Sequence, residues 1–410
     1  MNAVVAYLCA LWLLMEALRQ TLAWWVLRLQ QDEDADAHFA SDSRFDDIEV
    51  LQAVRSGDPQ LAETLSAVLA ALGGRGARLH WLVDEDDEEA QTAVQQALQA
   101  QAQASAQVRL SLHPPCPARC NPKLFKLDRA LRHCDRDYVL VLDDDAELPA
   151  ASLQALREAV RGMGPTSTPQ AATALPVYRG VPWPASRART GARGLGAALL
   201  ARFVNDQAAL TYLPGSGEQG GLSLNGMCWL MRLDALEALG GFAPQLGHLT
   251  DDLAMAQAIR AAGGRILQRH EPVWLSTSLD GLAAYGRQMQ RWMLFAQLLL
   301  RTLRGRERIR VLVELGLPQL LPLLALVGLV RAPGWIAAGL AVAAFVLHVV
   351  GRRALQQACT QAAPRAQPLL SLLSMLLLPL HALHAALNPR IVWRQQRYRV
   401  RASDDFEEIR

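Results

Sequence analysis

The sequence predicts an α/β protein with a mainly parallel sheet and helices on both faces of that sheet. From residue 48 onward, short apolar segments of strand type alternate with longer segments whose apolar residues recur at helical spacing. These segments follow one another at the spacing of βαβ units, which favours parallel strands. Long apolar segments lie at both ends of the chain. We therefore expect the sheet domain to be attached to N- and C-terminal transmembrane or interfacial helices.

The composition narrows the class of protein. The 410 residues suffice for one or two domains, and a formal net charge of +2 without a basic patch argues against a nucleic-acid partner. Hydrophobic residues make up 51% of the chain and the mean hydropathy is +0.09, which is high for a soluble protein. The six cysteines suggest no disulfide framework in a chain of this length, and the CPARC loop at 116–120 matches no standard zinc pattern.

Residues 1–29 form the first expected membrane helix. This segment is apolar apart from Glu16, Arg19 and Gln20, and it lacks the basic start and the small-residue cleavage site of a signal peptide. The three polar residues leave an interfacial amphipathic helix open as the alternative. Residues 30–47 are acidic and poor in large apolar side chains, so we expect an acidic linker there.

The first half of the α/β domain follows a regular pattern. The segment after the first strand is apolar at every third or fourth residue and stops at a GlyGlyArgGly sequence, as an amphipathic helix does. The second strand runs directly into an acidic cluster at 84–89. The elements expected here are strands at 48–54, 78–83 and 108–112 and helices at 61–72, about 90–104 and 124–133.

The apolar segment 138–142 ends on three aspartates, Asp143, Asp144 and Asp145. Such a segment is typical of a buried parallel strand, whose carboxyl end lies at the ligand-binding edge of an open sheet. Carboxylates at spacing i, i+2 repel one another unless a cation neutralises them. We therefore expect Asp143 and Asp145 to form a site for a metal and a diphosphate. The alternative is a solvated acidic turn that only ends the strand.

The second half of the domain is less regular. The Gly-rich stretch 213–221 indicates either a mobile lid or a plain surface loop, and residues 224–232 indicate a buried strand. Thr250 is a natural N-cap, which places Asp252 in the first turn of the next helix. Because acids are favoured at helix starts, a purely structural role for this aspartate is the alternative.

A basic amphipathic helix is expected at 285–292. Gln288 and Arg291 share one face of it at spacing i, i+3, so both can reach one ligand, and Trp292 follows directly. Arginine and tryptophan also favour a membrane interface, which leaves a juxtamembrane anchor as the alternative.

Three further apolar segments, each about long enough to cross a bilayer, lie at 311–330, 335–350 and 368–387. Arginines cluster beside them, at 301–310, 352–353 and 390–401. Arginine-rich segments favour the cytoplasmic side, but with four crossing segments they cannot all lie there. Either the last segment or the first of the three is therefore re-entrant or interfacial. The expected parts of the chain are an α/β domain at 48–300, membrane helices with a basic tail at 301–401 and an acidic tail at 402–410.

The ordered motifs of the chain resemble those of the ceramide glucosyltransferase family. These are membrane-bound inverting glycosyltransferases, and they include bacterial enzymes that act on hopanoids and other lipids. The resemblance covers roughly residues 48–401. The motifs that carry it are VRSGDPQL (54–61), DEDDEE (84–89), NPK (121–123), DDD (143–145), NGMCWLMR (225–232), TDD (250–252), QMQRW (288–292) and NPRIVWRQQRYRVR (388–401).

The resemblance implies a GT-A-type, Rossmann-like sheet and the transfer of a hexose or N-acetylhexosamine from a UDP-sugar to a lipid hydroxyl, such as that of a ceramide or hopanoid. It implies a multi-pass protein of the inner membrane with a cytoplasmic catalytic domain. The expected partners are the nucleotide sugar, the lipid acceptor and the bilayer, without nucleic acid or an inferred protein partner. Two alternatives are a processive polysaccharide synthase, for which three C-terminal segments are few, and a catalytically silent lipid-binding or scaffold protein.

The resemblance also implies a donor-binding set of residues. Asp84 or Asp87 holds the uracil or ribose, and Lys123 and Asp143 lie on the donor side. Asp143 and Asp145 bind a divalent metal that bridges the diphosphate. Carboxylate oxygens suit a hard cation, so Mg²⁺ or Mn²⁺ is expected.

On the acceptor side, the resemblance implies that Asp252 deprotonates the acceptor hydroxyl. Gln288, Arg291 and Trp292 line the acceptor and diphosphate side of the site. A carboxylate near a dry pocket that faces the membrane would have a raised pKa, which suits a general base.

Overall fold

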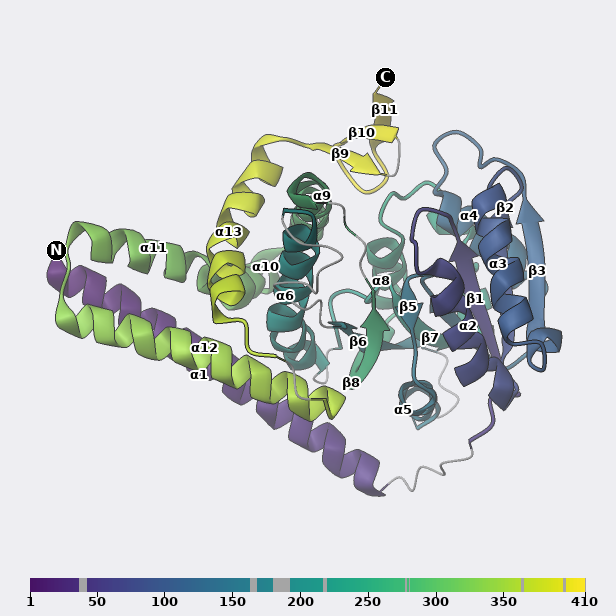
Figure 1. Ribbon diagram of the computed structural model, residues 1–410, viewed down its shortest axis with the longest axis horizontal. Coiled ribbons are helices and arrows are strands. Elements are labelled where there is room, and N and C mark those ends of the chain that lie inside the picture. Colours follow the sequence, from purple (N-terminus) through teal and green to yellow (C-terminus); the bar gives the residue numbers. More distant parts are fainter. Residues whose placement is uncertain are drawn as a thin grey trace.

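The computed structural model describes residues 1–36, 43–162, 168–179, 192–216, 220–276, 279, 281–362, 365–393 and 396–409. Figure 1 shows an α/β domain from which long helices project to one side. The projecting helices are α1 (Asn2–Asp36), α11 (Leu317–Arg331) and α12 (Trp335–Thr360). Within the described part, four helical segments are long and apolar enough to cross a membrane: α1, the segment through α10 (Gly305–Val311) and α11, α12, and α13 (Pro368–Leu387).

The α/β domain is built on an eight-stranded mixed sheet with the strand order β3-β2-β1-β4-β7-β6-β8-β5. Of the seven pairings among these described strands, four are parallel, which confirms the predicted mainly parallel sheet. The strands are β1 (Ile48–Val54), β2 (Arg78–Asp84), β3 (Val108–His113), β4 (Tyr138–Leu142), β5 (Ala146–Glu147), β6 (Gln170–Tyr178), β7 (Cys228–Arg232) and β8 (Arg265–Leu275).

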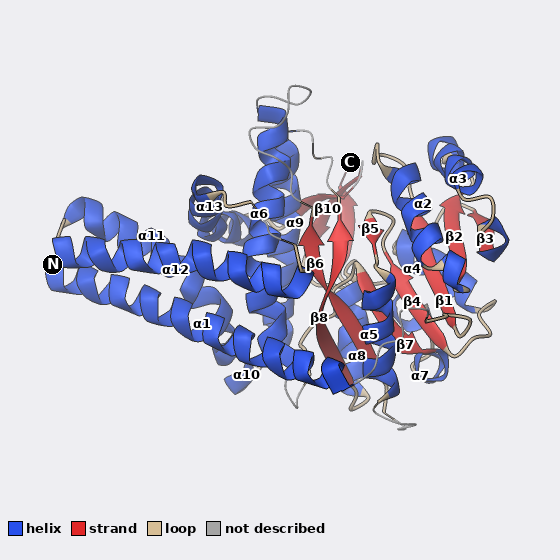
Figure 2. Cartoon of the chain, turned by 60° about the horizontal axis from the view of Figure 1, so that its bottom comes forward, coloured by secondary structure: helices blue, strands red, loops and turns tan. Residues whose placement is uncertain are grey.

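Helices cover both faces of the sheet, as the sequence predicted (Figure 2). Strand β4 shows why, because its five residues are all buried and alternate between the two sides. Leu140 and Leu142 face one helical layer, and Val139 and Val141 face the other. The first layer holds α2 (Leu61–Ala71), α3 (Glu88–Ala100), α5 (Ala150–Arg161) and α6 (Ala192–Tyr212), and the second holds α4 (Pro122–Leu131), α7 (Leu233–Ala238) and α8 (Asp251–Ala261).

Helix α1 continues to Asp36, so the first residues of the expected linker at 30–47 are helical. Polar contacts to β8 hold these last turns in place. Gln30 Nε2 donates to the carbonyl of Gln268 at 2.7 Å, and Asp34 lies 2.5 Å from the Arg269 guanidinium. These partners lie far away in the sequence, and the acidic composition of the segment gave no sign of them.

The strand expected at 224–232 begins only at Cys228 and runs antiparallel to β4. The Asn225 side chain accepts from the N–H of Met227 at 3.3 Å and donates to the carbonyl of Ala174 at 3.1 Å. These bonds fold residues 225–227 into a turn. In the Gly-rich stretch, Leu213–Ser216 form a 3₁₀ turn, whereas residues 217–219 lie outside the described part, so the lid stays a prediction.

The basic and acidic tails form a small antiparallel sheet of three strands, β9 (Arg390–Trp393), β10 (Gln396–Val400) and β11 (Phe406–Ile409). Opposite charges meet across it, since Arg399 pairs in register with Glu407. The sheet packs through Ile391 and Val400 on Leu294 and Leu298 of α9 (Gly281–Thr302). The tail of the chain therefore belongs to the folded domain.

A buried polar cluster joins the projecting helices to the α/β domain. Glu16 of α1 pairs with Arg352 of α12, and each side chain is only 3% exposed. Gln20 donates to the same carboxylate at 2.8 Å. Arg352 Nε donates to the carbonyl oxygen of Asp206 in α6 at 2.7 Å. Glu16 and Gln20, two of the residues that interrupt the apolar first segment, thus face protein.

Shorter turns complete the chain. A π-helical turn at Leu312–Gly316 connects α10 to α11. The 3₁₀ turns outside the Gly-rich stretch lie at Gly73–Arg75, Ser105–Gln107 and Ala243–Gln245.

Candidate active site

Residues from several elements meet at the carboxyl edge of the sheet. Strands β1, β2 and β4 are parallel, so the residues that follow them lie at one edge. Antiparallel β7 brings the residues that precede it to the same edge, because Cys228 pairs with Leu142. The N–H of Asp143 donates to the carbonyl of Met227 at 2.9 Å. The turn after β4 and the turn before β7 are thereby fixed against each other.

Lys123 connects two of the aspartate motifs. Its Nζ lies 2.6 Å from Asp143 Oδ1 and 2.8 Å from Asp251 Oδ2, and it donates to the carbonyl of Gly226 at 3.1 Å. Burial opposes the charge, but the two carboxylates outweigh it and raise the pKa of Lys123. The lysine is placed by the start of α4, where the Asn121 side chain caps the helix by accepting from the N–H of Lys123 at 2.9 Å.

Asp252 lies in the first turn of α8, as the sequence predicted. It faces the turn at Gly226, where an added Cβ would lie 3.2 Å from Asp252 Oδ2. Burial and the neighbouring Asp251 carboxylate raise the pKa of Asp252 to about 7. A carboxyl group with this pKa can take up and release a proton near neutral pH, which an ordinary helix-capping aspartate does not do.

Asp145 and Arg291 influence each other electrostatically at this edge of the sheet. Burial, together with the Asp143 and Asp144 carboxylates, raises the pKa of Asp145 well above its usual range. Burial lowers the pKa of Arg291, although the Asp145 carboxylate opposes that effect. Among the described residues, Arg291 Nε has no hydrogen-bond partner. Helix α9 thus brings an incompletely paired guanidinium into the electrostatic field of the aspartate motif.

Gln288 and Trp292, the other two residues expected in the site from α9, point to different partners. Arg291 donates to Gln288 Oε1 at 3.0 Å, so these two side chains share a face, as predicted. Trp292 instead packs against Phe203 of α6 with ring centroids 6.0 Å apart. Its indole therefore helps to fix α9 against the core.

The two candidate aspartates of the first acidic cluster, at 84–89, have different partners. Asp84 lies 3.0 Å from Lys126 Nζ, whose side chain is 1% exposed. Asp87 caps α3 and accepts from the N–H of Ser56 at 3.0 Å. Burial opposes ionisation of Asp87, but the N–H donors of Ser56 and Ala90 outweigh it and lower its pKa.

A cleft of about 450 Å³ lies beside this cluster. Asp144 and Asp145 line one part of it, and the turn after β1 lines another. Asp144 Oδ2 accepts from the N–H of Arg55 at 2.7 Å, which holds that turn in place. The lining residues are Arg55, Ser56, Gly57, Asp58, Glu89, Asp144 and Asp145.

The C-terminal tail reaches the loop that carries the acids of α8. The N–H of Leu249 donates to the carbonyl of Ser403 at 2.8 Å, and the Thr250 and Ser403 hydroxyls lie 2.5 Å apart. Thr250 occupies the N-cap position but its hydroxyl makes no bond to the helix. Ser403 therefore positions the residue that precedes Asp251 and Asp252.

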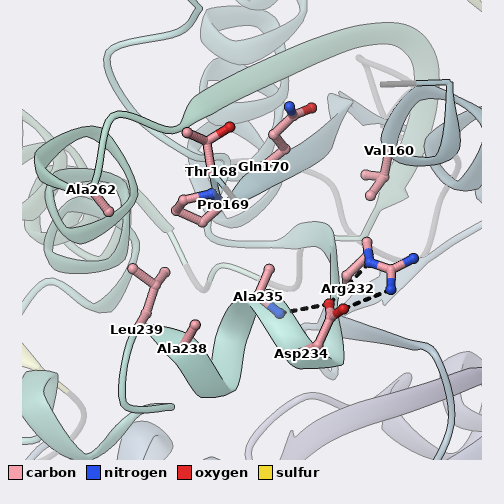
Figure 3. Close-up of a pocket in the computed structure, with 10 residues that line it drawn as sticks. All are labelled: Val160, Thr168, Pro169, Gln170, Arg232, Asp234, Ala235, Ala238, Leu239 and Ala262. Carbon is pink, nitrogen blue, oxygen red and sulfur yellow. Dashed lines mark hydrogen bonds and ion pairs between the residues drawn. The ribbon is translucent and has the colours of Figure 1, made fainter. Parts of the chain in front are cut away.

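A second cavity, of about 280 Å³, lies at the opposite edge of the sheet (Figure 3). Gln170 begins β6 there and Arg232 ends β7, and the Arg232–Asp234 ion pair lines one wall. None of the residues expected in the site lies in this cavity.

Glu49, His80 and the thiol of Cys134 are close enough together to hold a metal ion. The Glu49 carboxylate already accepts from Arg78 at 2.8 Å and contacts His80 Nε2 at 2.7 Å. Protein groups therefore satisfy this buried carboxylate, and the cluster stabilises the sheet edge away from the acidic motifs.

Sequence reasoning missed Gly226, Lys126, Tyr178 and Ser403. Burial and the Asp145 carboxylate raise the pKa of Tyr178, which places this phenol beside the DDD motif. The spacing of the two lysines in NPKLFK could have indicated Lys126, since i, i+3 positions share a helix face. Nothing local in the sequence indicates Ser403, because its contacts come from residues more than 150 positions earlier.

An open sheet with acidic motifs at its carboxyl edge is the architecture of a ligand-binding α/β protein, and the helices attached to it are long and apolar enough to cross a membrane. The chain belongs to glycosyl transferase family 21, whose family model matches residues 5–405. This match confirms the resemblance seen in the motifs, and the prediction of a glycosyltransferase with a GT-A-type fold. No protein with a curated description matches the chain.

Solved structures of other glycosyltransferases are similar to the chain at low identity. The mannosyltransferase PcManGT from Pyrobaculum calidifontis, in complex with GDP-Man and Mn²⁺, is 16% identical with a TM-score of 0.47, over 91% of this chain and 98% of that one. TarS 1-349 from S. aureus is 10% identical with a TM-score of 0.38, over 86% and 96%. Similarity at this level says nothing about the donor or the acceptor of this chain.

Proposed function

We propose that the protein transfers a hexose or N-acetylhexosamine from a UDP-sugar to the hydroxyl of a membrane lipid, of ceramide or hopanoid type, with inversion at the anomeric carbon. The observation that carries this proposal is Asp252. Its carboxyl group is partly buried and has a pKa raised to about 7, and the residue follows directly on Asp251, whose carboxylate shares Lys123 with Asp143. Transfer in a single displacement needs a base that takes the proton of the acceptor hydroxyl and a group that binds the leaving diphosphate. Asp252 and Asp143 are proposed for these two tasks.

Asp252 is proposed as the general base. Inversion needs an acceptor oxygen that attacks from the side opposite the leaving diphosphate, and the proton of that hydroxyl passes to the Asp252 carboxylate as the new C–O bond forms. A pKa near 7 keeps a large fraction of Asp252 ionised at neutral pH while making it a far stronger base than a solvent-exposed aspartate. Gly226 leaves room beside the carboxylate.

The side chains of Asp143 and Asp145 are suitable ligands for a divalent metal ion. Asp143 and Asp145 offer only carboxylate oxygens, and burial together with the neighbouring carboxylates raises the pKa of Asp145, an effect that a bound cation would oppose. We propose that these two residues hold Mg²⁺ or Mn²⁺. When bound, the ion would offset the negative charge of the departing diphosphate.

The remaining residues are proposed to hold the donor. Asp87 has a lowered pKa and lies beside the cleft, whereas Asp84 is paired with Lys126. We therefore favour Asp87 over Asp84 as the contact to the uridine. Lys123 holds the Asp143 carboxylate in place through an ion pair of 2.6 Å.

On the α9 side, Arg291 is proposed to meet the diphosphate, because its guanidinium is incompletely paired and lies near Asp145. Gln288 orients that guanidinium through its 3.0 Å hydrogen bond. Trp292 supports the acceptor side by packing α9 against α6.

The apolar helices support a lipid acceptor. They would hold the domain at the bilayer, where a lipid hydroxyl is available. The arginine clusters beside these helices favour a multi-pass protein of the inner membrane with the catalytic domain in the cytoplasm.

The test uses the full chain in vesicles made from bacterial membrane lipids, incubated with individual UDP-sugars, with products identified by mass spectrometry. We expect one lipid to gain one sugar residue. Asp252→Asn should lower kcat by about 10²- to 10⁴-fold, whereas Asp234→Asn, at the opposite edge of the sheet, should have wild-type activity. Retained transfer by Asp252→Asn, or a polymeric product, would contradict the proposal.

A further inference from the structure

Helix α13 lies across the other apolar helices. In Figure 1 it crosses the direction of α1, α11 and α12, and in Figure 2 it is seen nearly end-on while those helices extend from left to right across the picture. Its partners are α9 and α6, with a further contact to α11. A helix that runs across a bundle of bilayer-crossing helices lies along the membrane surface.

The two faces of α13 differ in what covers them. One face packs against protein and includes Leu370, Ser374, Met375 and Leu378. The other face is mainly apolar and is exposed in the first and last turns of the helix, where His384 is the exposed polar residue. Its exposed residues are Leu369 (80%), Leu373 (39%), Leu380 (50%), Leu383 (57%) and Leu387 (76%). The helix contains no Lys, Arg, Asp or Glu, and Arg365 and Arg390 flank it.

The positions of the arginine clusters indicate how α13 is oriented relative to the membrane. If all four apolar segments crossed the bilayer, the arginines at 301–310 and 352–353 would lie on one side and those at 390–401 on the other. With α13 along the surface, all three clusters lie on the side of the α/β domain, which agrees with the preference of arginine for one side of a membrane protein. Arg331, between α11 and α12, then lies at the far end of the bundle.

We propose that α13 is an interfacial helix, with its exposed leucine face in the acyl region of the leaflet next to the catalytic domain, and that α1, α11 and α12 cross the bilayer. The arginines at both ends of α13 extend to the lipid phosphates. The covered face of α13 packs against α11, because Met375 shares one buried apolar cluster with Leu321 and Ala325.

This arrangement places the candidate active site one helix layer from the lipid. Helix α9 contacts α13 through Tyr285, whose hydroxyl is 3.1 Å from His381 Nε2, and through Gln297, which donates to the carbonyl of Ala382 at 2.8 Å. Arg291 of the same helix lies near Asp145. The relevance to a lipid acceptor rests on the proposed function, whereas the orientation of α13 does not.

The test measures membrane depth at matched positions. Single cysteines replace Leu373 and Leu387 in α13, and Ile336 and Val350 in α12, in the full chain with its native cysteines replaced. Each carries a nitroxide in vesicles of phosphatidylethanolamine and phosphatidylglycerol. Both pairs are 14 residues apart in an exposed position, which is about 21 Å along a helix.

We expect the two α13 labels to report the same shallow depth from their relative accessibility to oxygen and to a water-soluble nickel chelate. The two α12 labels should differ in depth by most of the distance of about 21 Å that separates them along the helix. A depth difference in α13 as large as that in α12 would overturn the proposal.

A second measurement needs no spectroscopy. Arg365→Cys and Arg390→Cys, at the two ends of α13, are exposed to a membrane-impermeant maleimide in sealed vesicles, with Gln96→Cys on the exposed face of α3 as the control. Both ends should react from the same side as the control. Reaction of the two ends from opposite sides would show a crossing helix, whether or not the protein transfers sugar.

Discussion

Gly226→Ala adds one methyl group beside the proposed base. The new Cβ would lie 3.1 Å from Asp252 Cβ, 3.2 Å from its Oδ2 and 3.3 Å from its Cγ. Ordinary contacts of this kind begin at 3.4 Å, so the carboxylate must move by a few tenths of an ångström. Gly226 does not have a positive φ, so alanine fits the backbone without strain. The substitution therefore acts through the position of Asp252.

The size of the effect follows from that displacement. A misplacement of about 1 Å costs a reaction about 10²-fold, so a few tenths of an ångström should lower kcat by about three- to tenfold. KM for the donor should stay unchanged, because the cleft beside Asp87 is not touched. Initial rates at saturating lipid acceptor give both constants, and thermal unfolding of the same sample checks the fold.

Gly247→Ala is the matched control, since a Cβ at Gly247 meets nothing within 4 Å. Its kcat should equal that of the wild type. If Gly226→Ala and Gly247→Ala had the same kcat, contact between residue 226 and Asp252 would have no part in catalysis. That result would contradict the proposal that Asp252, in its position beside Gly226, is the base.

Three further predictions concern the same site. Because Asp252 has a pKa of about 7 and acts ionised, log kcat should fall with unit slope as the pH drops below about 7, and a flat pH–rate profile from about pH 8 to about pH 5 would contradict this role. Ser403→Ala removes the partner of the Thr250 hydroxyl and should lower kcat several-fold with KM for the donor unchanged, whereas Ser403→Thr should restore the activity; equal loss in both variants would argue for a folding effect. Chelation by EDTA should abolish transfer, Mg²⁺ or Mn²⁺ should restore it, and Asp145→Asn should raise the metal concentration needed for half-maximal rate; activity that is insensitive to EDTA would argue against the metal site.

The first half of the domain could be predicted closely from the sequence because its signals are local. Burial on both faces makes the strand at 138–142 an unbroken apolar run, and the GlyGlyArgGly stop follows the first helix directly. The aspartates after that strand could be assigned to the ligand-binding edge because parallel topology places every strand end there. Their mutual positions through Lys123 could not be predicted, since that contact joins residues from three separate segments.

Contacts between residues of different elements explain the parts of the fold that the sequence did not predict. The extension of α1 to Asp36 depends on Gln268 and Arg269, and the short β7 depends on a bond from Asn225 to Ala174. The C-terminal strands were missed because opposite charges on β10 and β11 pair only once the chain has turned back. For α1 and β7 the deciding partner is distant in sequence, where neither periodicity nor composition carries information.

The pairing of Glu16 with Arg352 also has a consequence for the order of synthesis. The two residues are 336 positions apart, so α1 leaves the ribosome long before its partner helix exists. A carboxylate that is taken out of water without a partner costs several kcal/mol. We expect newly made α1 to sit shallowly in the bilayer until α12 has been translated. A chain that stops before α12 should then be degraded, even though every strand of its eight-stranded sheet has been made.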